Sequence, residues 1–140
     1  PFYHRLQPKN YYLILYSLFT SDNYRREKTI LQMTSNLYPN TEQLLQRCVS
    51  YAEENTVLPS NALRQLLAAS RYSAPKLKPY APILLLRIKN DNLVNSQSSV
   101  SLAQSWLVPI ETHPLAGHDL PLDDGDWVYE KISHWLANEN

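Results

Sequence analysis

The first half of the chain has the hydrophobic pattern of helices. Between residues 8 and 72, apolar side chains recur at a spacing of three or four residues, and no strand-like alternation competes with it. Four helices are predicted, at residues 8–19, about 23–33, about 41–52 and about 60–68. Asp22 precedes the second of them and is a good N-cap, because its carboxylate accepts a hydrogen bond from a free backbone N–H of the first turn.

The pattern changes after residue 72. Residues 73–82 contain three prolines, too many for a helix or a central strand. A short apolar run follows at residues 83–88 and is typical of a strand covered on both faces. A helix is then predicted at residues 96–106, a second strand at 108–112, a loop up to Gly125 and a last helix at 126–137. We therefore expect two regions, residues 1–79 and residues 80–140.

Two candidate catalytic residues follow the two predicted strands. A strand that reaches the next strand through a helix normally forms a right-handed crossover with parallel strands, so the carboxyl ends of both lie at one edge of the sheet. Asp91 follows the first strand and His118 the second, at the edge where open α/β sheets bind ligands. An aspartate beside a histidine accepts the Nδ1 proton and stabilises the imidazolium that forms when Nε2 takes a proton. The pair is predicted to be a general base with its orienting acid.

The segments around these two residues also carry a family pattern. Residues 82–94 read PILLLRIKNDNLV, and residues 113–127 read HPLAGHDLPLDDGDW. They resemble the acid-bearing strand and the histidine loop of α/β-hydrolases of the bacterial serine-hydrolase type, whose triad runs Ser, then Asp or Glu, then His along the chain. The resemblance implies an α/β fold: a helical lid at residues 1–79, then the C-terminal part of the hydrolase core at residues 80–140, a βαβα unit with parallel strands. It also implies esterase-like cleavage of an ester, thioester or amide bond through a Ser-His-Asp triad, with His118 and Asp91 as its catalytic residues.

The serine of such a triad is not found in the sequence. The family places it in a G-x-S-x-G turn, yet the two glycines, Gly117 and Gly125, flank no such serine. Two parallel strands by themselves would also leave unpaired edges and uncovered apolar faces. We therefore expect an N-terminal part of the same protein, ahead of Pro1, to supply the nucleophile, the oxyanion hole and the rest of the sheet, and to act with this chain on a small-molecule acyl substrate.

Charge and composition narrow the partners. The 13 Lys and Arg residues balance the 13 Asp and Glu residues, so no overall field favours nucleic acid or an anionic membrane. No stretch approaches the roughly 18 to 20 apolar residues that a membrane helix needs. Cys48 is the only cysteine, which excludes an intramolecular disulfide and fits a reducing cytoplasm. We expect a cytoplasmic protein with no membrane span, no nucleic-acid partner, no metal and no cofactor.

Several residues near the candidate pair have alternative interpretations. His113 ends the second predicted strand and competes with His118, although it lies before the Gly-His step that matches the family. A metal site is a second alternative, with the ligands His113, His118, Asp119 and Asp123. The spacing of these residues matches no known ligand pattern. Carboxylates at the start of a helix satisfy free N–H groups, and this is the role expected of Asp123, Asp124 and Asp126 before the last helix.

The helical half offers two further candidates. Cys48 lies on the apolar stripe of the third helix and is expected to be a packed cysteine rather than a nucleophile. Tyr12 and Tyr16 of the first helix are predicted to contact the substrate, although such tyrosines also pack helices with their phenol groups at the rim. A different class of function is a non-catalytic protein-interaction module, in which Asp91 and His118 are structural.

Overall fold

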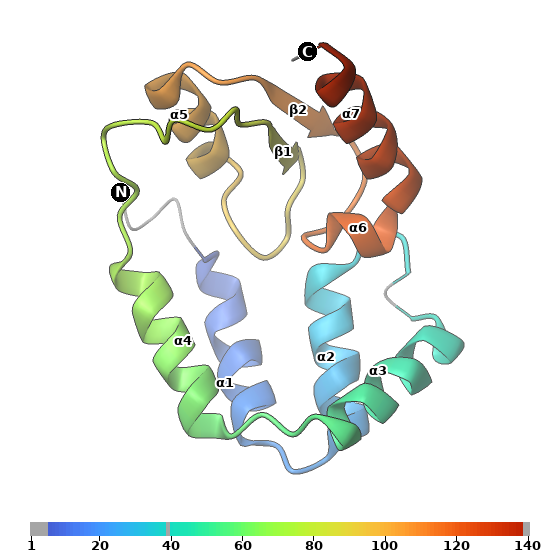
Figure 1. Cartoon of the computed structure of the whole chain (residues 1–140). Helices are drawn as coiled ribbons and strands as arrows, with labels where there is room; N and C mark the ends of the chain where they lie inside the picture. The colour runs from blue at the N-terminus through green and yellow to red at the C-terminus, as the bar shows by residue number, and fades with distance from the viewer. Residues whose placement is uncertain (1–5, 39, 139–140) are drawn as a thin grey trace.

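Four helices fill the first half of the chain. The computed structural model describes residues 6–38 and 40–138, and within them it has seven α-helices and a two-stranded parallel sheet (Figure 1). The first four are α1 (Tyr11–Phe19), α2 (Asn23–Thr34), α3 (Glu42–Glu54) and α4 (Pro59–Arg71), preceded by a 3-10 turn at Pro8–Asn10. The predicted helical half is confirmed. Within the described ranges, no helix is both long enough and apolar enough to cross a bilayer.

Helix α2 is central to this half. It packs against α1 and against α3, and α1 also contacts α4. Leu31 of α2 and Leu45 of α3 are both 3% exposed, so each turns its apolar stripe inward. Asp22 caps α2 as predicted, because its Oδ1 accepts a hydrogen bond from the backbone N–H of Arg25 at 3.0 Å. The start of α2 is thus fixed by its cap, and its apolar face by packing against α1 and α3.

The second half contains the sheet. Strand β1 (Leu85–Ile88) connects through α5 (Gln97–Trp106) to β2 (Ile110–His113), and the strands pair in parallel with Ile88 opposite His113. The predicted order of strand, helix and strand is confirmed, as is the parallel pairing. Each strand starts two residues later than predicted. Pro109 explains the later start of β2, since it has no backbone N–H to donate to the ladder.

Two further helices cover one face of the sheet, α6 (Leu120–Asp123) and α7 (Gly125–Asn138). The buried cluster at this face consists of Ile88, Ala116 and Leu120, with Leu86, Trp127 and Val128 packed against it. The sequence predicts an uninterrupted loop up to Gly125, and this is wrong for α6. The carbonyl oxygen of Asp119 accepts hydrogen bonds from the N–H groups of Leu122 and Asp123, which closes the extra helical turn.

The sheet is only partly covered within the described residues. Three of the four residues of β1 are half-buried and only Ile88 is buried, so the described residues cover this strand incompletely. An open hollow of about 350 Å³ lies between α7 and the start of β1, and it is lined by Pro82, Ile83, Leu84, Leu86, Ile132 and Trp135. The indole N–H of Trp135 is buried and has no hydrogen-bond partner among the residues that the structure describes.

Replacing Leu120 tests the packing of α6 on the sheet. Leu120 is 5% exposed, and Leu120→Ala should lower the free energy of unfolding by about 2–5 kcal/mol, because it removes buried apolar atoms and leaves a cavity. Leu77→Ala removes the same atoms from a side chain that is 84% exposed and should change that free energy by less than about 0.5 kcal/mol. Urea unfolding followed by circular dichroism measures both, and equal losses would contradict this packing.

Candidate functional site

Asp91 and His118 meet at the carboxyl edge of the sheet. Asp91 follows the end of β1 at Ile88, and His118 follows the end of β2 at His113. Because Ile88 and His113 are paired in the parallel ladder, the two turns leave the sheet side by side. The Nδ1 atom of His118 lies 2.9 Å from Oδ2 of Asp91, within hydrogen-bond distance. The structure therefore brings together the two residues that the sequence predicts as a pair.

Both oxygens of the Asp91 carboxylate are in use. Oδ1 accepts hydrogen bonds from the backbone N–H groups of Leu93 at 2.8 Å and Val94 at 3.0 Å, while Oδ2 faces His118. The side chain is 6% exposed. Burial works to raise the pKa of Asp91, but the hydrogen bonds from His118 and from the two backbone groups outweigh it and lower the pKa below its ordinary value. Asp91 thus starts a turn and also serves as the charged partner of the histidine.

His118 keeps one ring nitrogen open. Its side chain is 40% exposed, and none of the described residues forms a hydrogen bond with its Nε2. The hydrogen bond to Asp91 raises the pKa of His118 above its ordinary value, against the opposing effect of burial. When the Nδ1 proton is held by Asp91, the lone pair of Nε2 is free to accept a proton. The electrostatics of the pair are those of a general base.

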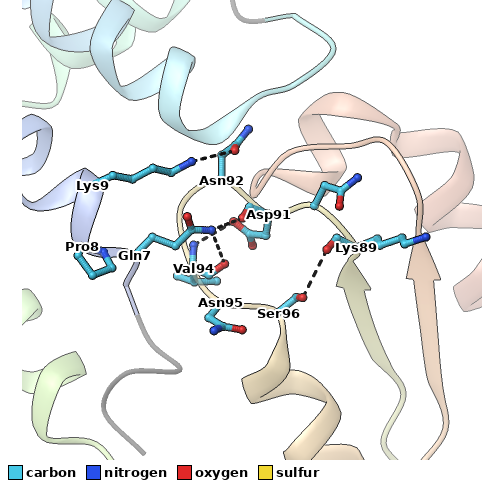
Figure 2. A pocket seen from close by; sticks show the side chains of 10 residues that line it. Gln7, Pro8, Lys9, Lys89, Asp91, Asn92, Val94, Asn95 and Ser96 are labelled. Carbon is cyan, nitrogen blue, oxygen red and sulfur yellow. Dashed lines mark hydrogen bonds between the residues drawn. The ribbon is translucent and has the colours of Figure 1, made fainter.

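The turn that carries Asp91 is also held by the segment leading into α1. The Nε2 group of Gln7 donates a hydrogen bond to the carbonyl oxygen of Asp91 at 2.5 Å, although the two residues are 84 positions apart (Figure 2). The backbone N–H of Gln7 donates to the carbonyl oxygen of Leu93 at 2.9 Å. Asn10, which is 4% exposed, donates through Nδ2 to the carbonyl oxygen of Asn92 at 2.6 Å. These contacts fix the backbone of the acid-bearing turn from the side opposite its own strand.

A polar hollow of about 680 Å³ opens beside this turn (Figure 2). It is lined by residues 7–9, 89–92 and 94–96, which include Lys9, Lys89 and Asp91. The side chains of Tyr12 and Tyr16 on α1 are 75% and 36% exposed, and neither belongs to the lining found among the described residues. Their contact with a substrate stays a prediction.

His113 has a structural environment, unlike His118. It is 5% exposed, and its Nδ1 accepts hydrogen bonds from the backbone N–H groups of Ala116 at 2.8 Å and Leu115 at 3.2 Å. Its Nε2 lies 3.1 Å from Oδ2 of Asp124. Both ring nitrogens are therefore occupied by groups close to it in sequence, and His113 holds the loop together instead of facing a substrate.

The carboxylates expected at the start of the last helix have two different roles. Asp124 begins α7 as predicted, because its Oδ1 accepts a hydrogen bond from the N–H of Trp127 at 3.0 Å. This bond, together with that to His113, lowers the pKa of Asp124. For Asp123 the prediction is wrong, since its buried carboxylate turns away from α7 and binds residues 35–37 and Gly117. The residues near Asp123 in sequence give no signal of this role, because Ser35, Asn36 and Leu37 lie 86 to 88 positions away along the chain.

Two other candidates have no site geometry. Burial raises the pKa of the half-buried Cys48 thiol, whereas a nucleophilic cysteine needs a lowered pKa, so a packing role fits its surroundings. Within residues 6–38 and 40–138, no group of three His, Cys, Asp or Glu side chains is arranged to hold a metal ion.

No family model, curated protein or solved structure matches this chain. The chemistry of the site therefore has to be argued from its geometry. An imidazole oriented by a buried carboxylate takes a proton from a hydroxyl, a thiol or a water held within hydrogen-bond reach of Nε2. The described residues supply an imidazole and a carboxylate in this arrangement. None of them places a hydroxyl, thiol or other group in a hydrogen bond with Nε2 of His118.

The pKa of His118 gives a direct test of the contact with Asp91. Titration of the histidine ring signals by NMR should place the pKa of His118 above the ordinary value of about 6.5, because the carboxylate stabilises the imidazolium. Asp91→Asn removes that charge and should lower the pKa of His118.

Asp119→Asn is the matched control for this titration. Asp119 adjoins His118 in sequence and acts on it only through a weaker Coulomb attraction. Its removal should therefore lower the pKa of His118 by less than the removal of Asp91 does. Equal shifts in the two variants would contradict a specific bond between Asp91 and His118.

Proposed function

We propose that this chain is the C-terminal part of a serine-type hydrolase of the α/β-hydrolase kind, with His118 as general base and Asp91 as the acid that orients it. The observation that carries the proposal is the 2.9 Å contact between His118 Nδ1 and Asp91 Oδ2 at the carboxyl edge of a parallel sheet, with Nε2 left open. The order of acid before histidine along the chain also fits a hydrolase triad of this kind.

In the proposed reaction, Nε2 of His118 removes the proton of a serine hydroxyl as the oxygen attacks the carbonyl carbon of an ester, thioester or amide. The imidazolium is stabilised by Asp91 and then returns the proton to the leaving group, which departs as the acyl-enzyme forms. Water, deprotonated by the same nitrogen, next attacks the acyl-enzyme and releases the acid. The serine is regenerated, so the cycle needs no cofactor.

The serine and the oxyanion hole come, in this proposal, from an N-terminal part of the same protein. Two observations support a larger sheet. Among the described residues β1 pairs only with β2, so its other edge has free backbone groups. The apolar hollow beside α7, and the N–H of Trp135 that finds no partner within residues 6–38 and 40–138, lie where more structure would cover the start of β1.

Helices α1 to α4 form the lid in this proposal. In Figure 1 these helices lie below the turn that follows β1, a position that suits a cover that selects a small acyl substrate and shelters the reaction from water. The exposed phenol groups of Tyr12 and Tyr16 are the proposed substrate contacts on this lid.

Replacing His118 in the intact protein tests the proposed function. His118→Ala should lower kcat for p-nitrophenyl ester hydrolysis by at least about 10³-fold, because the serine then has no base. His134→Ala is the matched control, since His134 is exposed on α7 and forms its hydrogen bond with Asn138, and it should leave kcat within about two-fold. Activity that survives His118→Ala, or an upstream sequence with no G-x-S-x-G turn, would contradict the hydrolase and favour the interaction module.

The pH profile of the intact enzyme gives a second test. The base must be neutral to accept a proton, so kcat/KM should rise with pH through the pKa of His118, which the carboxylate holds above about 6.5. Asp91→Asn should move the midpoint of this rise to lower pH and reduce the plateau. A midpoint that does not respond to Asp91→Asn would show that another group controls the rate.

A further inference from the structure

A buried carboxylate joins the end of α2 to the histidine loop. Asp123 is 4% exposed and accepts hydrogen bonds from two parts of the chain. The segment after α2 contributes the hydroxyl of Ser35 and the backbone N–H groups of Asn36 at 2.8 Å and Leu37 at 3.3 Å. The histidine loop contributes the N–H of Gly117 at 2.6 Å. Burial works to raise the pKa of Asp123, but these bonds lower it below its ordinary value, so the group they bind is the charged carboxylate.

Gly117 lets the two segments touch. A Cβ atom at this position would lie 2.5 Å from the carbonyl oxygen of Thr34 and 2.6 Å from the backbone nitrogen of Asn36, which is closer than a methyl group can approach. On the other side of His118, the N–H of Asp119 donates a hydrogen bond to the same Thr34 carbonyl at 2.9 Å. Both sequence neighbours of His118 are therefore fixed against the end of α2, which lies beside α6 in Figure 1.

Asn36 extends this contact to the acid-bearing turn. Its Nδ2 donates a hydrogen bond to the carbonyl oxygen of Ala116 at 2.9 Å, and its Oδ1 accepts one from Nδ2 of Asn92 at 2.8 Å. Asn92 directly follows Asp91 in the chain. A single side chain thus bridges the two turns that bring the base and its orienting acid together.

We propose that Asp123 and Asn36 are positioning residues that hold His118 in register with Asp91, with the end of α2 as their common support. The inference rests on the proposed function, in which this pair is the catalytic base. Neither residue touches the reacting atoms. Hydrogen bonds weaken steeply as their geometry departs from the optimum, and a catalytic group displaced by about 1 Å can cost about 100-fold in rate. A lid helix therefore sets the geometry of the base.

The test reads the pKa of His118 in the intact protein. Asp123→Asn keeps the size of the side chain but removes the charge that binds its donors, and it should lower the pKa of His118 toward the value measured for Asp91→Asn. Asp126→Asn, the same change at an exposed carboxylate of α7, should leave it unchanged. Adding Asp123→Asn to Asp91→Asn should give no further fall, because the bond through which Asp123 acts is already absent.

Asn36→Ala is the second variant. It tests the positioning role if circular dichroism shows that Asp123→Asn does not fold. Asn36 is only half-buried, and its loss breaks the bridge to Asn92 while the Asp123 carboxylate stays. It should also lower the pKa of His118. An unchanged pKa of His118 in a folded Asp123→Asn protein, or in folded Asn36→Ala if the first does not fold, overturns the positioning role.

Ester hydrolysis by the same variants separates this inference from the proposed function. In an active enzyme, Asp123→Asn should lower kcat by about 10- to 100-fold and leave KM within about two-fold, because the defect lies in the base and not in substrate binding. A protein without hydrolase activity in which Asp123→Asn still shifts the pKa of His118 would refute the hydrolase and keep the positioning contact. An active enzyme in which Asp123→Asn leaves the pKa of His118 unchanged would support the hydrolase and refute the positioning contact.

Discussion

The parallel pairing of β1 with β2 is the constraint on which the candidate site depends. A parallel pair puts both carboxyl ends at one edge, and the register places Ile88 beside His113 so that the two following turns start next to each other. The hydrogen bond between Asp91 and His118 is possible only because of this arrangement, since the residues are 27 positions apart. In an antiparallel pair the two turns would leave the sheet at opposite ends. The crossover through α5 is what makes the pairing parallel.

The sheet alone does not fix the two turns, because each is several residues long and irregular. The conformation of the two turns is fixed by hydrogen bonds from the helical half. The segment at Gln7 and Asn10 holds the backbone of the acid-bearing turn, and the segment after α2 holds the histidine loop through Asp123 and Gly117. A buried carboxylate is costly unless its hydrogen bonds are complete, and Asp123 has four donors around it. The helical half is therefore part of the framework of the site.

Periodicity and turn chemistry were sufficient to predict every helix except α6, the strand order and the pair at the sheet edge, because these follow from local patterns and from one crossover. Asp22 as the cap of α2 is a contact with Arg25 three residues away, and local reasoning reaches it. The contact between Ser35 and Asp123 joins residues 88 positions apart, and that between Gln7 and Asp91 joins residues 84 apart. Such contacts depend on how the two halves dock, which no local pattern encodes. For the same reason Asp123 was assigned to the wrong helix start.

The segment from Asn10 to Asn92 begins and ends at the same turn, because Nδ2 of Asn10 binds the carbonyl oxygen of Asn92. Its four helices therefore lie in one long segment of chain whose two ends are held together by this hydrogen bond. The entropy cost of closing such a loop grows only with the logarithm of its length, by about 0.6 kcal/mol for each doubling. Over evolutionary time, the connections between α1 and α2 and between α3 and α4 can lengthen or shorten at little cost in stability. The residues from Thr34 to Leu37 do not share that freedom, because an insertion there would move the histidine loop itself.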